Sequence, residues 1–517
     1  MFGYFVFLIT FVKTASVVEA LSAEDVSRAF VLDAVIVAHL KNLLKEASNG
    51  THNQQPSNSD VHSHYVNKFI GEHEQLFGNA EALNTTERKG VEAASDPVKS
   101  LILTRRLSKD WSQLLRMSNT APHHTSWRRV KSEVLKAEKD LAVLLEEEDL
   151  TSQTNAFVRI VQMYKLEPSE LTELGHQRHR SFFSTNLKTV DVAFIGGTAF
   201  DERLYGTAVD LLSTVKQLAE NSSETTEDMT TSKRSELLPH LNHLIHLASN
   251  LHDLRLTSES YKQQPGMFPR LLSQSDAESA RLKCRLDSRG SPYLLLMPAM
   301  VEEHSLNPKI VTFYKVLSHK QINKITDTAR PMLEQAQIKS SDDIGPDESF
   351  KVRSSYTAWV REERLPMLKK LRMKIEALTG MSADENTNAA EILQVNLYAA
   401  GGYYLPHLDA FSLLSEQQDN VDVPAEFYGG DRIGTFMFYM NDVEAGGHTA
   451  FPRIGVGVKP SAGSAVFWSN LLPDGFEDTR TMHGACPVLK GIKWVSNKWI
   501  RYDQQFRKKP CPPLQAS

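Results

Sequence analysis

The chain has 517 residues, which at about 150 residues per domain predicts roughly three domains. Its 41% hydrophobic and 23% charged content is ordinary for a folded protein. With a net charge of −5, the chain lacks the excess of positive charge that is typical of nucleic-acid-binding proteins, so a nucleic-acid partner is not expected. The 26 glycines and 22 prolines follow no three-residue period, and three cysteines are too few for a disulfide scaffold. These numbers favour a globular, multidomain protein.

The N-terminus carries the pattern of an export signal. An apolar run over residues 1–12 is followed by Lys13 and by small residues around Ala20, which predicts a signal peptide over residues 1–20. The run is shorter than the ~20 apolar residues that span a bilayer, so we expect no stable membrane insertion; a membrane anchor or a misassigned start is the alternative. Sequons at Asn49, Asn84 and Asn221 would then be candidate glycosylation sites.

The first part of the mature chain is predicted to be helical. Apolar residues recur at helical spacing over residues 23–47, and similar patterns cover 94–117 and 126–147. Residues 48–65 are polar and are expected to form a loop. Together these patterns predict an all-α N-terminal domain over residues 21–148, either a plain bundle or a coiled-coil dimerisation element.

A second helical domain is predicted over residues 149–264. Its expected helices cover residues 152–166, 190–200, 203–218, 237–249 and 254–263. Paired short helices are typical of tetratricopeptide-like modules, whose concave face takes an extended peptide, although a plain bundle fits the pattern equally well. Residues 265–298 are expected to be a linker.

Beyond the linker the pattern changes from helix to strand. After a helical stretch near 319–338, strand-like runs separated by turn residues cover 392–398, 433–440, 449–451, 464–467 and 494–499. Short strands at this spacing suit a sandwich or jelly roll. The predicted fold class is therefore α+β and multidomain, with all-α regions followed by a C-terminal jelly roll over residues 299–513.

The candidate chemistry lies in this last domain. His407 and Asp409 are two residues apart, so on an extended strand both side chains project from one face. His483 is the best candidate for a third ligand. Two histidines and one carboxylate form the ligand set of non-haem Fe(II) oxygenases, although a zinc site or no metal stays open at this point. Lys493 favours the oxygenase interpretation, because a buried cation near iron could bind the far carboxylate of 2-oxoglutarate.

The run from 301 to 512 closely resembles the catalytic region of the collagen prolyl 4-hydroxylase α-subunit family. The resemblance rests on the motif Gly-Gly-x-Tyr-x-Pro-His-x-Asp at 401–409. Further matching segments lie at 431–433, 438–440, 446–447, 465–468, 486–489 and 493–499. It implies a double-stranded β-helix with iron on His407, Asp409 and His483, and 2-oxoglutarate on Lys493 with help from Tyr398. More weakly, residues 21–145 resemble the family's dimerisation region and 152–264 its peptide-substrate domain, where Tyr205 is the one obviously placed groove tyrosine.

The resemblance also implies a function. The expected reaction is 4-hydroxylation of peptidyl proline in procollagen-like chains, with Fe(II), 2-oxoglutarate, dioxygen and L-ascorbate as cofactors and cosubstrates. The expected setting is the endoplasmic reticulum lumen. There a protein disulfide isomerase would serve as β subunit in an α2β2-like assembly and supply the retention signal that the C-terminus lacks. Three alternatives stay open: a catalytically weakened paralogue that binds proline-rich peptides, a hydroxylase of a non-collagen secreted protein, and a zinc hydrolase.

The sequence departs from the family at several positions. Arg501 stands where the family usually has a histidine that assists 2-oxoglutarate, and we expect the arginine to pair with the cosubstrate's charge. His448 replaces a small residue and is not expected to be a fourth ligand. The resemblance implies a disulfide between Cys486 and Cys511, whereas Cys284 lacks its family partner and is expected to be a free thiol or to form an intermolecular bond.

Overall fold

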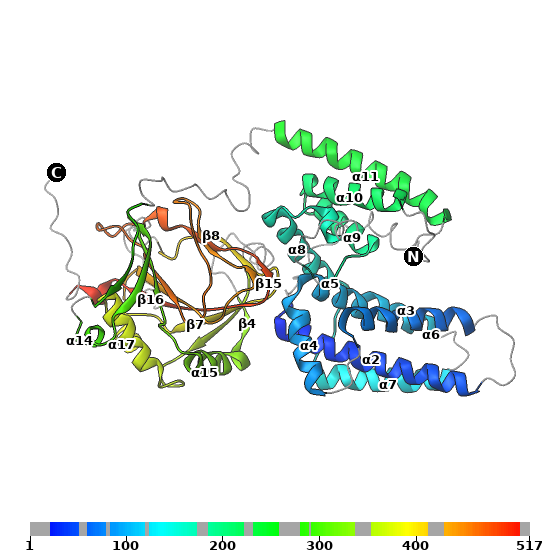
Figure 1. Cartoon of the computed structure of the whole chain (residues 1–517), viewed down its shortest axis with the longest axis horizontal. Helices are drawn as coiled ribbons and strands as arrows, with labels where there is room; N and C mark the ends of the chain where they lie inside the picture. The colour runs from blue at the N-terminus through cyan, green and yellow to red at the C-terminus, as the bar shows by residue number, and fades with distance from the viewer. Residues whose placement is uncertain are drawn as a thin grey trace, which may run out of the picture.

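The computed structural model describes residues 21–50, 59–78, 83–118, 124–172, 183, 185–221, 231–257, 280–288, 291–336, 353–411 and 429–506. Two parts are evident in Figure 1, a helical region from α2 to α11 and a β region from β1 to β16. The predicted signal peptide and Cys511 lie outside the described residues. No helix in the described part of the chain combines the length and apolar composition needed to cross a bilayer.

The first helices form a bundle around α2. Their bounds are α2 (Ala23–Gly50), α3 (Ser59–Phe77), α4 (Leu83–Ser95), α5 (Pro97–Arg105), the π-helical turn η2 (Arg106–Asp110), α6 (Trp111–Ser118) and α7 (His124–Leu141). The loop predicted over 48–65 is wrong at both ends, because α2 continues to Gly50 and α3 begins at Ser59; residues 51–58 lie outside the described residues. Val66, Phe69 and Ile70 of α3 are buried, and their spacing of three and four residues keeps them on one helical face despite the polar residues around them.

A second group of four helices follows the bundle. It consists of α8 (Glu147–Tyr164), α9 (Thr189–Asp201), α10 (Tyr205–Asn221) and α11 (Thr231–Thr257). Helices α9 and α10 correspond to the predicted pair over 190–218. The second predicted pair is wrong, since α11 runs continuously through residues 250–253. That stretch contains neither Gly nor Pro, so nothing in its backbone stops the helix.

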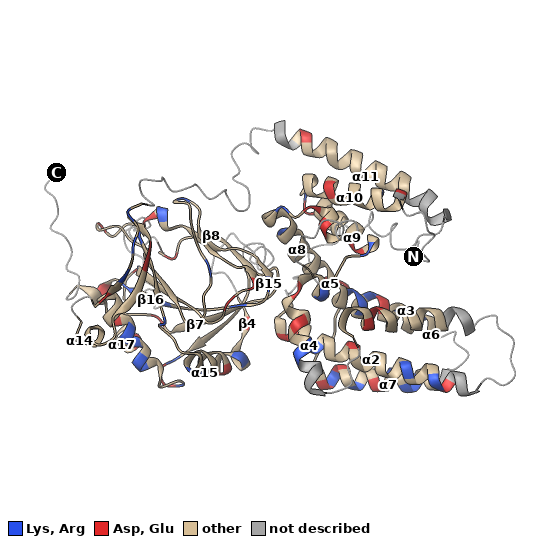
Figure 2. Ribbon diagram, viewed as in Figure 1, with Lys and Arg blue, Asp and Glu red and all other residues tan. Residues whose placement is uncertain are grey.

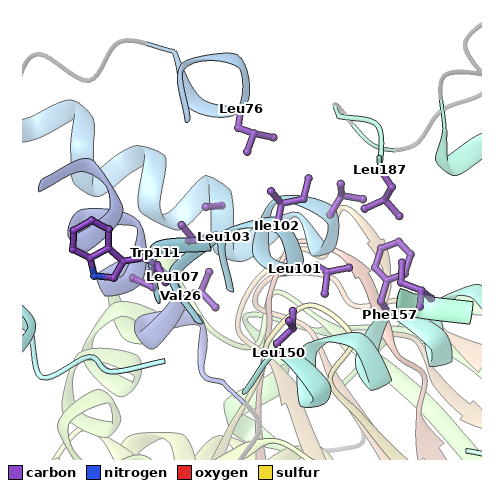
Figure 3. Close-up of a cluster of buried hydrophobic side chains, with 14 of the residues drawn as sticks. Val26, Leu76, Leu101, Ile102, Leu103, Leu107, Trp111, Leu150, Phe157 and Leu187 are labelled. Carbon is purple, nitrogen blue, oxygen red and sulfur yellow. The ribbon is translucent and has the colours of Figure 1, made fainter. Parts of the chain in front are cut away.

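One continuous hydrophobic core joins both helical groups. Apart from Leu489 of the β region, its buried side chains lie between α2 and α11, among them Val26, Leu101 and Phe157 (Figure 3). The domain boundary predicted at 148/149 therefore falls inside a shared core.

Buried charges tie the same helices together. Charged residues gather where α3 and α5 meet in Figure 2. There the guanidinium of Arg105 pairs with Glu72 at 2.6 Å, with Asp110 at 2.6 Å and with Asp191 of α9 at 3.0 Å. This arginine links the bundle to the second helical group.

The β region consists of two main antiparallel sheets. The larger has the order β1 (Cys284–Asp287), β2 (Ala299–Leu306), β3 (Lys309–Tyr314), β13 (Ala465–Ser469), β9 (Arg432–Tyr439), β16 (Lys493–Arg501), β7 (Leu393–Tyr398), β6 (Tyr356–Val360) and β4 (Glu334–Gln335). The smaller has the order β12 (Val456–Val458), β11 (Thr449–Phe451), β14 (His483–Ala485), β8 (Tyr403–His407) and β5 (Arg353–Ser354), and β10 (Ala445–Gly446) pairs with β15 (Val488–Lys490). Two sheets joined in this way form a jelly roll, which confirms the predicted fold class.

The sheet begins earlier than predicted. Strand β1 lies inside the segment expected to be a linker, and its Cys284 stands opposite Glu302 of β2. Helix α14 (Pro292–Leu295) follows within the same segment. The linker prediction over 265–298 is therefore wrong from Cys284 onward. The edge strand is mostly exposed, and it therefore lacks the alternating apolar pattern that marks a half-buried strand.

Two helices cover the outer face of the larger sheet. Apolar residues of α15 (His319–Ala329) and α17 (Leu368–Thr379) pack against outward-facing strand residues such as Val395 and Phe436. Because alternate residues of a strand point to opposite faces, the inner face of β7, β9 and β16 is left for the interior between the sheets. The candidate site lies there.

Candidate active site

Neighbouring strands of the smaller sheet carry the three predicted metal ligands. His407 ends β8, Asp409 follows two residues later, and His483 begins β14. Strands β8 and β14 pair antiparallel with His483 directly opposite His407. Pairing in this register brings together histidines that are far apart in the sequence.

The three side chains form a compact group. One ligand atom from each residue lies within 4.8 Å of the other two. His407 Nε2 is 3.8 Å from Asp409 Oδ1, and His483 Nε2 is 3.6 Å from Asp409 Oδ2. Among the described residues this is the single group of three or more His, Cys, Asp or Glu side chains close enough to hold a metal ion.

Hydrogen bonds orient both imidazoles. Nδ1 of His407 donates to the carbonyl of Leu405 at 2.8 Å, and Nδ1 of His483 donates to the carbonyl of Thr481 at 3.0 Å. With the proton held on Nδ1, each Nε2 keeps a free lone pair directed at Asp409, which is the tautomer a metal requires.

Burial keeps these ligands ready for a metal. Burial, together with the neighbouring His483, lowers the pKa of His407 to about 3, so the ring stays neutral at physiological pH. Burial alone would raise the pKa of Asp409, but His483, His407 and Arg432 together hold this pKa below its usual value. The site therefore offers the neutral imidazole of His407 and the carboxylate of Asp409, with the His483 ring beside them.

Aromatic rings shelter the site from water. The ring of Tyr404 stacks on His407 with centroids 3.6 Å apart, while Trp468 and Phe451 lie 4.6 and 5.6 Å from His483. Such a lining lowers the local polarity and strengthens electrostatic interactions inside it.

Two residues that support Asp409 were not assigned a role from the sequence. The hydroxyl of Thr435 donates to Asp409 Oδ2 at 2.6 Å, and Arg432 Nη1 donates to the Asp409 carbonyl at 3.3 Å. Both lie in or next to the strand predicted over 433–440. The alternation of that strand could have placed Thr435 on the inner face, but its partner is set by the fold.

Lys493 lies deep in the same interior, at the start of β16. It is 1% exposed, and no carboxylate among the described residues pairs with it. Burial lowers its pKa to about 8. Its Nζ is 5.6 Å from the ring centroid of Tyr398 and 5.8 Å from that of Tyr439, and Tyr398 stands opposite Lys493 in the register of β7 and β16. A buried cation without a counter-charge is costly unless a ligand supplies one.

Arg501 occupies the opposite end of the same strand. Eight residues of extended chain place its Cα about 26 Å from that of Lys493. Its guanidinium pairs with Glu391 at 2.9 Å and donates to the carbonyl of Gly430 at 2.8 Å. Glu391 also holds Arg432 at 2.6 Å. This arrangement favours an indirect influence of Arg501 on Asp409 over the direct pairing with the cosubstrate that the sequence suggested.

The remaining predicted site residues are not members of the metal group. Tyr205 begins α10, and its ring packs edge-on against Phe200 at 5.6 Å. Asn49, Asn84 and Asn221 lie at or near the ends of α2, α4 and α10, with side chains outside the described set. Cys486 is buried and Cys284 is an exposed free thiol; because Cys511 is not described, its pairing with Cys486 stays a prediction.

Comparisons with known proteins agree with this geometry. Residues 393–501 match the 2OG-Fe(II) oxygenase superfamily, and residues 63–175 match the N-terminal region of the prolyl 4-hydroxylase alpha-subunit. The chain is 40% identical over 232 residues to prolyl 4-hydroxylase subunit alpha-1 of Homo sapiens, covering 45% of this chain but only 42% of that protein. A viral collagen prolyl hydroxylase from Paramecium Bursaria Chlorella virus-1 superposes with a TM-score of 0.28 at 23% identity, covering 37% of this chain and 95% of the other.

A longer match covers both regions of the molecule. Prolyl 4-hydroxylase subunit alpha-2 of Gallus gallus is 30% identical over 475 residues, which covers 80% of this chain and 84% of that protein. The chain therefore belongs to the prolyl 4-hydroxylase alpha-subunit family.

Proposed function

We propose that the chain catalyses 4-hydroxylation of peptidyl proline in procollagen-like substrates, coupled to decarboxylation of 2-oxoglutarate to succinate and CO2. The observation that carries the proposal is the pairing of two features in one interior. The first is the His-Asp-His group, which lies in a region that matches the 2OG-Fe(II) oxygenase superfamily. The second is the buried ammonium of Lys493, which has no carboxylate partner among the described residues and is suited to bind a dicarboxylate. A zinc hydrolase would leave this ammonium without a purpose.

The described residues fit an iron site. His407 and His483 present free Nε2 lone pairs and Asp409 a carboxylate, a ligand set that leaves open positions on a divalent iron. Bound Fe(II) would supply the activation of dioxygen that oxidises both cosubstrate and peptide.

The protein supplies binding, orientation and shelter. Lys493 would bind the far carboxylate of 2-oxoglutarate as a point charge, with the Tyr398 hydroxyl beside it. Thr435 keeps Asp409 oriented, and Trp468 with Phe451 excludes water on the His483 side.

The wider setting of the enzyme belongs to the same proposal. The helical group from α8 to α11 would present proline-rich peptides, with Tyr205 on the groove. L-ascorbate would restore iron oxidised in uncoupled turnovers, and a protein disulfide isomerase would act as β subunit in the endoplasmic reticulum lumen. Support for these points comes from family membership.

The test is turnover of the co-expressed complex. The chain, produced with a disulfide isomerase, would receive Fe(II), ascorbate and 2-oxoglutarate, with or without a Pro-Pro-Gly repeat peptide. We expect peptide-dependent succinate and one added oxygen per modified proline. Peptide binding without succinate would instead identify a weakened paralogue that binds proline-rich chains, and turnover of a different secreted peptide alone would reassign the substrate.

A further inference from the structure

The segment 486–492 connects two functional side chains. It follows β14, which carries His483, and leads into β16, which begins with Lys493. A shift of this segment would therefore displace a metal ligand and the candidate cosubstrate lysine together.

The helical region holds this segment from outside the jelly roll. The hydroxyl of Tyr164, the last residue of α8, donates to the carbonyl of Pro487 at 2.5 Å. The amide of Gly491 donates to the carbonyl of Ser95 at 2.7 Å. Leu489 is 5% exposed and is part of the helical hydrophobic core. In Figure 1, α8 and α5 accordingly face the edge of the β region where β15 lies.

Helix α8 also braces the strand that carries His407. The turn before β8 contains Gly401 at φ +76°, where a Cβ would lie 2.6 Å from Cβ of Ala156. Two residues further, the ring of Tyr403 lies 4.5 Å from the guanidinium of Arg159. The same helix thus contacts the approaches to both histidine ligands.

The close approach of Tyr164 depends on a glycine in the β region. Gly446 has φ +78°, and a Cβ there would lie 2.5 Å from the Tyr164 hydroxyl oxygen. Burial raises the pKa of Tyr164, so the phenol stays a hydrogen-bond donor throughout the physiological range. The Pro487 carbonyl also accepts from the amide of Gly447 at 3.0 Å.

We propose that helix α8 positions the metal and cosubstrate pocket, with Tyr164 as the positioning residue that acts through Pro487 on His483 and Lys493. This inference rests on the proposed function only for the identity of the cosubstrate. Helix α8 is also the first helix of the candidate peptide domain. Peptide binding to that domain would therefore be coupled through α8 to the geometry of the oxygenase site.

The first test examines the metal-free full-length complex. Tyr164→Phe removes one hydroxyl and leaves the ring in place, and Pro487 keeps its bond from Gly447. We expect amide hydrogen exchange in residues 486–492 to accelerate roughly three- to ten-fold, the effect of losing one neutral hydrogen bond, without a change in the melting temperature. Tyr65→Phe, a partly buried tyrosine of the helical core, is the matched control and should leave this exchange unchanged.

The second test measures ligand binding without turnover. With Mn(II) under anaerobic conditions, calorimetry should show 2-oxoglutarate binding weakened by roughly three- to ten-fold in Tyr164→Phe and unchanged in Tyr65→Phe. In active enzyme the KM for 2-oxoglutarate should rise while the KM for peptide stays constant. Wild-type exchange and affinity in Tyr164→Phe would overturn the proposal, as would a lower melting temperature with unchanged affinity. Absence of turnover in the wild-type protein would contradict the proposed function instead. The hydrogen-exchange experiment would still test the positioning role of Tyr164.

Discussion

Each end of strand β16 carries a buried cation, but the two cations differ in whether a carboxylate lies beside them. At one end, Lys493 is fully enclosed between tyrosine rings with no carboxylate partner in the described part of the chain. At the other end, Arg501 is also buried but pairs with Glu391 and donates to a backbone carbonyl. An unpaired buried charge costs free energy that a bound ligand of opposite charge can recover, whereas a paired one already has its counter-charge within the fold. This difference supports the proposed ligand binding at the first end and favours a structural role for Arg501 at the second.

The largest effect is expected at the metal group beside the Lys493 end. His483→Ala should reduce succinate formation by at least about a hundred-fold, because loss of a direct ligand should exceed the 10–100-fold cost of losing an outer-shell partner. Metal content measured after dialysis should fall in parallel, with the circular dichroism spectrum retained. His319→Ala, at the exposed start of α15, is the control. Unchanged metal content would remove His483 from the site.

Lys493→Met separates binding from stability at the first end. Loss of a charge-assisted contact should weaken 2-oxoglutarate binding roughly 10- to 100-fold, with little change in peptide affinity. The apoprotein should become more stable by about 1–3 kcal/mol, because the variant no longer buries an unpaired charge. Calorimetric titration and denaturant unfolding measure the two effects. A destabilised apoprotein would show that Lys493 has a structural partner after all.

The same end should respond to pH. The pKa of Lys493 is lowered to about 8 by burial, so the ammonium loses its proton as the pH rises through 8 and its attraction for a dicarboxylate disappears. Affinity for 2-oxoglutarate should therefore be about tenfold weaker at pH 9 than at pH 7. Lys493→Met should lose this dependence, and a wild-type profile that is flat between pH 7 and 9 would contradict the assignment.

The smallest effect on ligand binding is expected at the second end. Arg501→His should leave the affinity for 2-oxoglutarate within about two-fold while lowering the free energy of unfolding by about 1 kcal/mol, since one ion-pair partner of Glu391 is lost. Arg480→His, at a more exposed arginine, serves as the control. A tenfold change in affinity would restore the direct role that the sequence suggested for Arg501.

Local patterns predicted the elements that carry strong periodicity. The strand-like runs that became β7, β9, β11, β13 and β16, and the pair α9 and α10, were visible because apolar residues repeat at the period of the element. Helix α3 was missed because polar residues surround its buried face. Strand β1 was missed because an exposed edge strand carries no alternation. The break predicted inside α11 is absent because residues 250–253 contain neither Gly nor Pro.

The sequence by itself determined the division into a helical part and a later β part, the His-x-Asp spacing at the end of β8 and the presence of a lysine near the second histidine. Only the tertiary structure decided that His483 stands opposite His407, that Thr435 holds Asp409, and that Lys493 is unpaired while Arg501 is paired. It also decided that Tyr164 reaches Pro487 across more than three hundred residues of sequence. Spacing along a strand fixes which face a side chain takes, but its partners depend on strand register and helix docking, which are set by contacts between distant segments.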